Sequence, residues 1–459
     1  MQKGGSPELL GKGNIGKILL SYSIPAIIAQ TAASLYNIID SIFIGYGVNK
    51  EALTGVGICL PLMNLATAFG AMVGAGGSIL ISIKLGQQDT KAANHILGNI
   101  VALNVILGLL ITAVGLIFMD PILNLFGASP VTIPYARDFM RIILIGNVFT
   151  HMYFGLCSAA RAAGFPQKAM TATLITVGVN VALAPIFIFV LGRGVAGAAS
   201  ATVLAQMTAL IILLIHFIDK QKQLHIIKKN LIPVIKTVKS IMAIGLSSFM
   251  LHICSCLVVI IINNQLKKYG GDLAIGAHAN INKVLMFFAM LVLGFNQGMQ
   301  TIAGYNFGAK LYNRVNEMFK KTVIYASIIM MTAFVCCELF AETICTWFTP
   351  DKDFIKMTAH GMRIAVAAFP VIGFSMVTSN YFQSINKAAI AAFLSTTRQM
   401  LLLTPILFIL PPHFGLDGVW LCMPVSDFTA TVLAAFFLIR QYKKFKQITD
   451  NNITQVKNG

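Results

Sequence analysis

The feature that most constrains this chain is the recurrence of long apolar segments. At 1.5 Å per residue, a window of about 20 such residues crosses the roughly 30 Å hydrocarbon core of a bilayer as a helix. Composition agrees, because 57% hydrophobic and 11% charged residues leave too little polar surface for a soluble chain of 459 residues. We therefore expect an all-α polytopic membrane protein with twelve transmembrane helices, at residues 17–45, 53–82, 95–119, 133–157, 169–191, 195–218, 238–265, 275–305, 320–348, 355–382, 388–410 and 417–440.

The two halves of the chain repeat each other. When the chain is aligned with itself at a shift of 220 to 222 residues, identical residues coincide: Gly86 with Gly308, Arg141 with Arg363, Pro185 with Pro405, and Gly194 and Gly197 with Gly415 and Gly418. Six helices per half return the chain to its starting side, so the repeats are parallel. This predicts two pseudo-symmetric six-helix bundles: an N-terminal lobe (1–218), a basic cytoplasmic linker (219–240), a C-terminal lobe (241–440) and a basic cytoplasmic tail (441–459).

The net charge is +18, and the charged residues are distributed along the chain as in a membrane protein. With a cytoplasmic N-terminus, about 23 of the 34 Lys and Arg residues fall on cytoplasmic segments and about 6 on the other side. The positive-inside rule then places both termini in the cytoplasm, and nothing calls for a nucleic-acid partner. The amphipathic pattern of linker 219–240 predicts a helix on the membrane surface. No cleaved signal peptide is indicated, so the first helix stays in the membrane.

The absence of certain motifs limits how the chain could obtain energy for its function. There is no GxxxxGK[ST] loop for ATP and no HExxH or GxSxG hydrolase motif. The eight cysteines lie in apolar spans and read as small hydrophobic residues rather than zinc ligands. We expect neither an enzyme nor a cofactor-dependent protein, and a transporter of this kind would use an ion gradient.

Polar residues inside the N-terminal spans are few. The segment from Ser23 to Gly45 has a single charge, Asp40, and a helix-bending proline, Pro25, which we interpret as a hinge. Asn180 and Thr202 lie near mid-span on the fifth and sixth helices, and their oxygens suit sodium or support a protonatable carboxylate. The alternatives are that Asp40 caps its helix or reaches water, and that Asn180 and Thr202 only join helices.

The C-terminal half offers a pair of opposite charges. Arg398 lies about ten residues into the eleventh helix and Asp427 about ten residues into the twelfth, which runs in the opposite direction. The two should lie at similar depth, where an ion pair lowers the cost of both charges. We interpret it as a structural pair in the lobe or beside a cavity.

The order of motifs resembles the multidrug and toxic compound extrusion (MATE) family of bacterial efflux transporters. The resemblance rests on SIPAIIAQTAASLYNIIDSIFIG, KLGQQDTKAANHILGN, RAAGFPQKAM, APIFIFVLGRGVAGAASATVLAQ, GYNFGAKLYNRV and TTRQMLLLTPILFILPPHFGLDGVWLCMPVSD. It implies two six-helix lobes around a V-shaped cavity, and export of cationic or amphipathic compounds across the bacterial cell membrane against proton or sodium flow. We expect the chain to be a monomer. The resemblance also implies a cation-coupling site at Asp40, Asn180 and Thr202, which would bind the ion directly if sodium is used, and a kink at Pro25.

One position departs from the family pattern. Ala184 stands where a pattern like DPIFIF would place an acid, so Asp40 has no second carboxylate beside it. The seventh helix between Ser247 and Ile262 also lacks an acid, which leaves the coupling ion open. Two other functions remain open at this stage: a flippase for lipid-linked precursors from the same superfamily, and a channel or non-transporting receptor.

Overall fold

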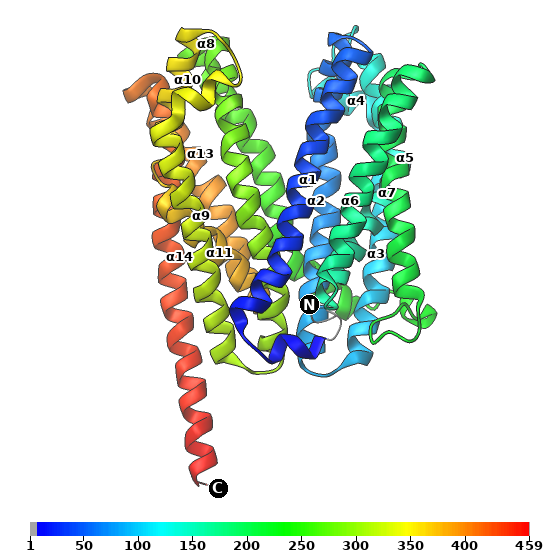
Figure 1. Cartoon of the computed structure of the whole chain (residues 1–459), viewed down its shortest axis with the longest axis vertical. Helices are drawn as coiled ribbons and strands as arrows, with labels where there is room; N and C mark the ends of the chain where they lie inside the picture. Colours follow the sequence, from blue (N-terminus) through cyan, green and yellow to red (C-terminus); the bar gives the residue numbers. More distant parts are fainter. Residues whose placement is uncertain (1–6, 459) are drawn as a thin grey trace. The chain divides into compact units, whose positions relative to one another are not determined.

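The chain is all helical in the computed structural model, which describes residues 7–458 except the side chains of Pro7, Asn37, Ile38, Tyr46, Lys50 and residues 444–458. Most of the predicted basic tail therefore lies outside the described side chains. The elements in order are η1 (Pro7–Gly11), α1 (Ile15–Gly47), α2 (Lys50–Gly86), α3 (Thr90–Ile117), α4 (Met119–Leu125), α5 (Ile133–Ala162), α6 (Pro166–Pro185), η2 (Ile186–Val190), α7 (Gly194–Ile218), η3 (Lys228–Leu231), α8 (Ile235–Gly308), α9 (Tyr312–Thr346), α10 (Lys352–Val366), α11 (Phe369–Ser384), α12 (Ala388–Thr396), η4 (Thr397–Leu403), α13 (Thr404–Ile409) and α14 (Pro411–Asn458) (Figure 1).

The predicted number of membrane spans is confirmed. Ten helices in the described residues are long and apolar enough to cross a membrane, and the bent pair α10 and α11 adds one more. The 74-residue α8 supplies two crossings, because Gly271 (φ 68°, ψ −165°) interrupts its helical backbone. Twelve crossings result. The predicted tenth span, residues 355–382, is bent: α10 and α11 differ in direction by 53°, and a proline in the first turn of α11 explains the break.

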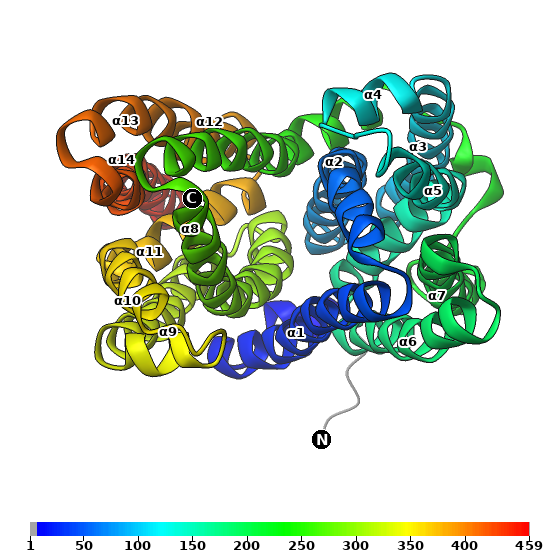
Figure 2. The same cartoon turned by 90° about the horizontal axis from the view of Figure 1, so that it is seen from above.

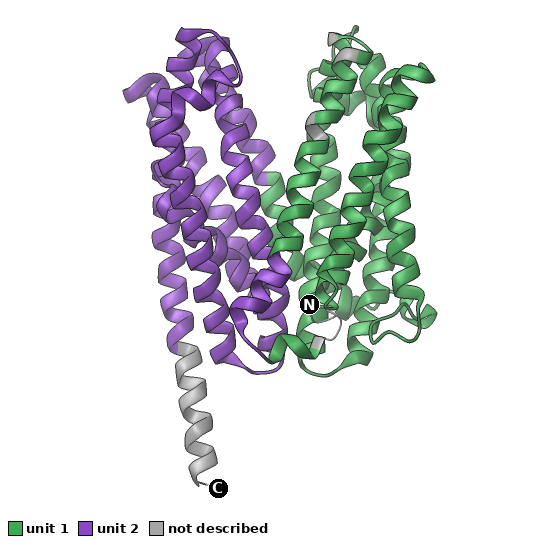
Figure 3. Ribbon diagram, viewed as in Figure 1, with its two compact units in different colours: residues 1–12, 24–253 green, residues 13–23, 254–459 purple. Residues whose placement is uncertain are grey.

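The chain divides into two compact units, and the division cuts through helices. Unit 1 comprises residues 1–12 and 24–253, and unit 2 comprises residues 13–23 and 254–459 (Figure 3). The first part of α1 thus packs in unit 2, whereas the first part of α8 packs in unit 1. Two of the three boundaries fall inside these helices, the third lies between η1 and α1, and none falls in linker 219–240.

Each unit is built from helices packed side by side. In unit 1, α2 packs on α3 and α5, and α7 packs on α5 and α6 (Figure 2). Its core between these helices contains Cys59, Leu144, Ala184 and Ala198, all fully buried. In unit 2, α9 packs on α10 and α11, and α14 packs on α11 and η4.

The internal repeat is visible in the backbone of both units. Gly194 and Gly415 both have positive φ, 53° and 59°, where glycine avoids strain. Three residues later, a Cβ on Gly197 would lie 2.7 Å from Phe187 O, and one on Gly418 would lie 2.7 Å from Leu410 O. The same tight turn, closed by the same close approach, therefore opens the sixth and the twelfth span.

The prediction of a surface helix in the linker is wrong. Residues 219–234 form an extended loop with the single 3-10 turn η3. Two asparagines of α3 bind its backbone: Asn94 donates to Gln223 O (3.3 Å) and accepts from His225 N (2.8 Å). Asn99 donates to Asn230 O (3.3 Å) and accepts from Val234 N (2.8 Å). These bonds replace those of a helix.

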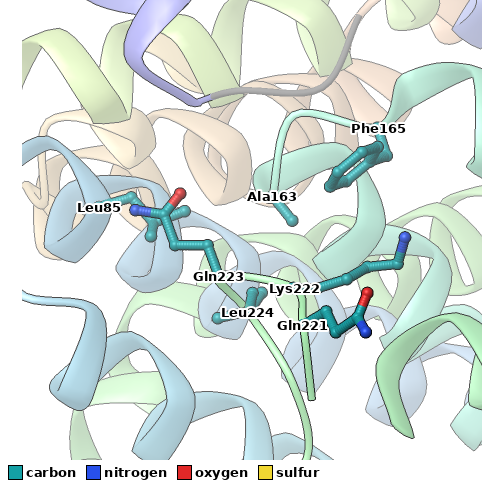
Figure 4. A pocket seen from close by; sticks show the side chains of 7 residues that line it. All are labelled: Leu85, Ala163, Phe165, Gln221, Lys222, Gln223 and Leu224. Carbon is teal, nitrogen blue, oxygen red and sulfur yellow. The ribbon is translucent and has the colours of Figure 1, made fainter. Parts of the chain in front are cut away.

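The held linker also packs against the ends of α2 and α5. Leu224 is 4% exposed, and residues 221–224 line a pocket with Leu85, Ala163 and Phe165 (Figure 4). The Lys222 ammonium lies 5.7 Å from the centre of the Phe165 ring, a cation–π distance. The linker is therefore a fixed part of unit 1.

Replacing Asn99 by alanine is expected to release the linker. Two backbone groups of the linker, Asn230 O and Val234 N, lose their hydrogen-bond partner, and each unpaired group costs about 1–3 kcal/mol of stability where it is buried. Trypsin should then cut at Lys228 or Lys229 at least several times faster than in the unmodified protein. Asn104→Ala is the control, because Asn104 donates only to Ile100 O within α3. Equal cleavage rates in all three proteins would show that the asparagine does not hold the linker.

Candidate functional site

Two predicted site residues meet in unit 1. Asn180 of α6 donates from Nδ2 to the Thr202 hydroxyl of α7 at 3.0 Å, and the two residues are 1% and 8% exposed. The hydroxyl in turn donates to Ala198 O at 3.2 Å. The proton of Thr202 is thereby committed to its own helix, so its oxygen faces Asn180 as an acceptor.

A second polar contact lies one helical turn along α7. Gln206 follows Thr202 by four residues and so shares its face of the helix. Its Oε1 accepts a hydrogen bond from the Thr150 hydroxyl of α5. Next to Thr150, the fully buried His151 bonds Ala66 O of α2 through Nε2 at 3.0 Å. Thr150 and His151 were not among the predicted site residues, although two adjacent polar residues inside the fourth apolar window were a usable signal.

Asp40 is the third residue of the predicted cation site. It lies on α1, and its Oδ1 is buried without a hydrogen-bond partner among the described residues. No described hydrogen bond links Asp40 to Asn180 or Thr202. A carboxylate oxygen without a donor is costly inside a membrane protein. The three-residue cation site therefore stays a prediction, with the Asn180–Thr202 pair as its formed part.

The other N-terminal positions are placed as follows. Pro25 lies inside α1, next to the point where the chain passes from unit 2 to unit 1. α1 is helical on both sides of it, and the hinge role stays a prediction. Ala184 is fully buried in the apolar core of unit 1, so no ionisable group takes the position of the missing acid.

Unit 2 holds the predicted ion pair. Arg398 Nε donates to Asp427 Oδ1 at 2.6 Å, and the two side chains are 29% and 9% exposed. Arg398 lies in η4, a π-helical segment, a form that is frequent at functional sites. Its neighbour Gln399 exchanges two hydrogen bonds with Ser255 of α8, at 2.9 and 3.2 Å. These bonds fix η4 between α8 and α14.

No cluster suited to a transition metal is present in the described residues, where no three His, Cys, Asp or Glu side chains gather. None of the eight cysteines forms a disulfide within the described part of the chain, and six are buried. The polar groups in the spans are mainly oxygen donors and amides, which suit protons, alkali cations or organic ligands.

Comparison with known proteins decides the family. The MatE family model matches residues 25–186 and 243–409, which is most of the chain. The chain belongs to the MatE family. The two matched stretches fall one in each half, so the MatE assignment and the internal repeat agree.

Relatives and solved structures match nearly the whole MatE chain. The multidrug export protein MepA of Staphylococcus haemolyticus is 25% identical over 427 residues, which cover 93% of this chain and 94% of that protein. MepA of Staphylococcus aureus strain MSSA476 is 23% identical over the same shares of both chains. A structure described as the outward-facing conformation of a multidrug resistance MATE family transporter of the MOP superfamily covers 97% of this chain and 100% of its own, with a TM-score of 0.91 and 24% identity. This likeness shows the fold.

Proposed function

We propose that the chain is a secondary active multidrug exporter that moves cationic or amphipathic small molecules in exchange for protons or sodium ions by alternating access. The observation that carries the proposal is the full-length match to proteins named for multidrug export, over 93% of this chain and 94% of the relative. We also propose that it is a monomer in the bacterial inner membrane with both termini in the cytoplasm, as the distribution of Lys and Arg favours.

Coupling is proposed to depend on unit 1. Asp40 is the acid that a proton or sodium ion would neutralise, and its unbonded Oδ1 favours such neutralisation. The bonded Asn180–Thr202 pair supplies two further oxygens. One monovalent cation that crosses 100 mV provides about 2.3 kcal/mol, which supports about 50-fold concentration of a neutral solute. The transported ion is here a substrate of the exchange.

The test is transport in proteoliposomes that contain the purified chain. A fluorescent lipophilic cation is followed while a pH gradient and a sodium gradient are imposed in separate experiments. We expect one gradient to drive concentration of the dye, with saturation. If neither gradient drives transport of the dye, the proposal is contradicted. Unsaturable ion flux would indicate a channel, and movement of isoprenoid-linked sugars alone would indicate a flippase.

Thr202→Val is expected to lower ion-driven transport at least about tenfold, because it removes the oxygen that accepts from Asn180 and leaves a buried amide unpaired. Thr202→Ser keeps the hydroxyl and should retain most of the activity. Thr208→Val is the matched control, since Thr208 is only half-buried and donates only to Leu204 O in the same helix. The role of Thr202 is refuted if the valine variants at 202 and 208 transport equally well.

A further inference from the structure

Two Arg–Asp pairs in the described residues differ in how many bonds they make. The exposed pair at one end of unit 1 is bidentate: Arg137 donates from Nε and Nη2 to the two oxygens of Asp120, both at 2.9 Å. The buried pair in unit 2 makes one hydrogen bond, from Arg398 Nε to Asp427 Oδ1. The pair in the membrane-spanning region, where unmade bonds cost most, is thus the one that is less satisfied.

The atoms of this pair that lack a hydrogen-bond partner can be named. A guanidinium carries five N–H donors, and only one of those on Arg398 has a protein acceptor among the described residues. Its terminal nitrogens Nη1 and Nη2 make no bond there, and neither does Asp427 Oδ2. Gln399 does not supply an acceptor, since both polar atoms of its side chain bond Ser255. A donor edge and an acceptor oxygen thus remain side by side.

The pair is also held in place and accessible. The Nε bond orients the guanidinium plane, and the Gln399–Ser255 bonds fix the next residue of η4. The Arg398 side chain is 29% exposed, whereas that of Asp427 is 9% exposed. A ligand would therefore reach the terminal nitrogens first and the carboxylate at its edge.

Charge balance selects the ligand. The pair has no net charge, and a net charge near mid-membrane is expensive. A simple cation or anion bound there would leave the site charged. A ligand group with one carboxylate and one ammonium would keep it neutral and fill both sets of unmade bonds, because a guanidinium fork matches a carboxylate.

We propose that Arg398 and Asp427 form a substrate subsite for zwitterionic compounds. The ligand carboxylate bonds Nη1 and Nη2 of Arg398, and its ammonium donates to Oδ2 of Asp427. This deepens the proposed function, on which it rests, by assigning two residues of unit 2 to substrate binding.

The test compares one aromatic amino acid dye with its methyl ester, which differs only by loss of the carboxylate charge. Binding of each to the detergent-purified full chain is measured by fluorescence polarisation. Arg398→Gln should raise the Kd of the zwitterion about tenfold or more. The Kd of the ester should stay unchanged or fall, because the ester keeps its ammonium and Asp427 then lacks its counter-ion. Arg398→Lys keeps the ion pair but not the fork and should lie between. Arg137→Gln, in the bidentate exposed pair, should change neither Kd.

The outcomes separate the subsite from the function. Equal changes for both compounds in Arg398→Gln and Arg398→Lys, no change for either, or no binding of the zwitterion to the unmodified chain would overturn the subsite. Zwitterion binding that depends on Arg398, together with absence of ion-driven dye transport in proteoliposomes, would retain the subsite and refute the exporter. Thermal unfolding of Arg398→Lys, expected to match the unmodified chain, shows that binding losses do not come from misfolding.

Discussion

Asp40→Asn is expected to abolish gradient-driven accumulation of dye. Asparagine has nearly the shape of aspartate but can neither take up a proton nor carry the negative charge that attracts a sodium ion. Accumulation driven by one ion at 100 mV should therefore fall from as much as about 50-fold to no concentration at all. Steady-state dye levels in proteoliposomes, with the pH and sodium gradients imposed separately, measure the loss and identify the ion.

The control for this variant is another acid of unit 1. Asp138 of α5 is exposed, and Asp138→Asn should leave accumulation unchanged. Downhill dye movement in Asp40→Asn, with no imposed gradient, should persist if the substrate path is intact. If Asp40→Asn still concentrates the dye as well as the unmodified protein, coupling lies elsewhere, and Asp427 becomes the acid to test.

Gly76→Ala and Gly245→Ala are expected to be the most destabilising of the small substitutions. A Cβ on Gly76 of α2 would lie 2.0 Å from Ile241 O, and one on Gly245 of α8 would lie 1.9 Å from Met72 O. Both clashes are with backbone, so no side chain can rotate away and the two helices must separate. The cost is about 3 kcal/mol or more, seen as a fall of roughly 5–10 °C in Tm in detergent.

The same helix provides the matched control. A Cβ on Gly57 of α2 would meet nothing within 4 Å, and alanine has the higher helix propensity, so Gly57→Ala should be neutral or slightly stabilising. A Tm for Gly76→Ala equal to that of Gly57→Ala would contradict the reciprocal glycine contact. This contact holds the first part of α8 within unit 1, so its loss should also reduce transport.

The apolar windows were sufficient to predict the twelve spans, because each crossing must satisfy its backbone hydrogen bonds within its own helix. That requirement is local and shows in length and composition. The repeat was equally readable, since Gly194 and Gly415 stand where the backbone needs positive φ. The pairing of Arg398 with Asp427 at one depth also followed from counting residues along two adjacent helices.

The tertiary structure decided which polar groups meet. A helix that is apolar on most of its surface carries little information on which side faces its neighbours. The sequence therefore placed Asp40 with Asn180 and Thr202, whereas the structure bonds only the last two. The linker shows the same limit: its amphipathic pattern favoured a helix, but Asn94, 129 residues before Gln223, binds its backbone as a loop. Helix identity is fixed by local hydrogen bonding, and helix rotation and long-range polar contacts are fixed by packing.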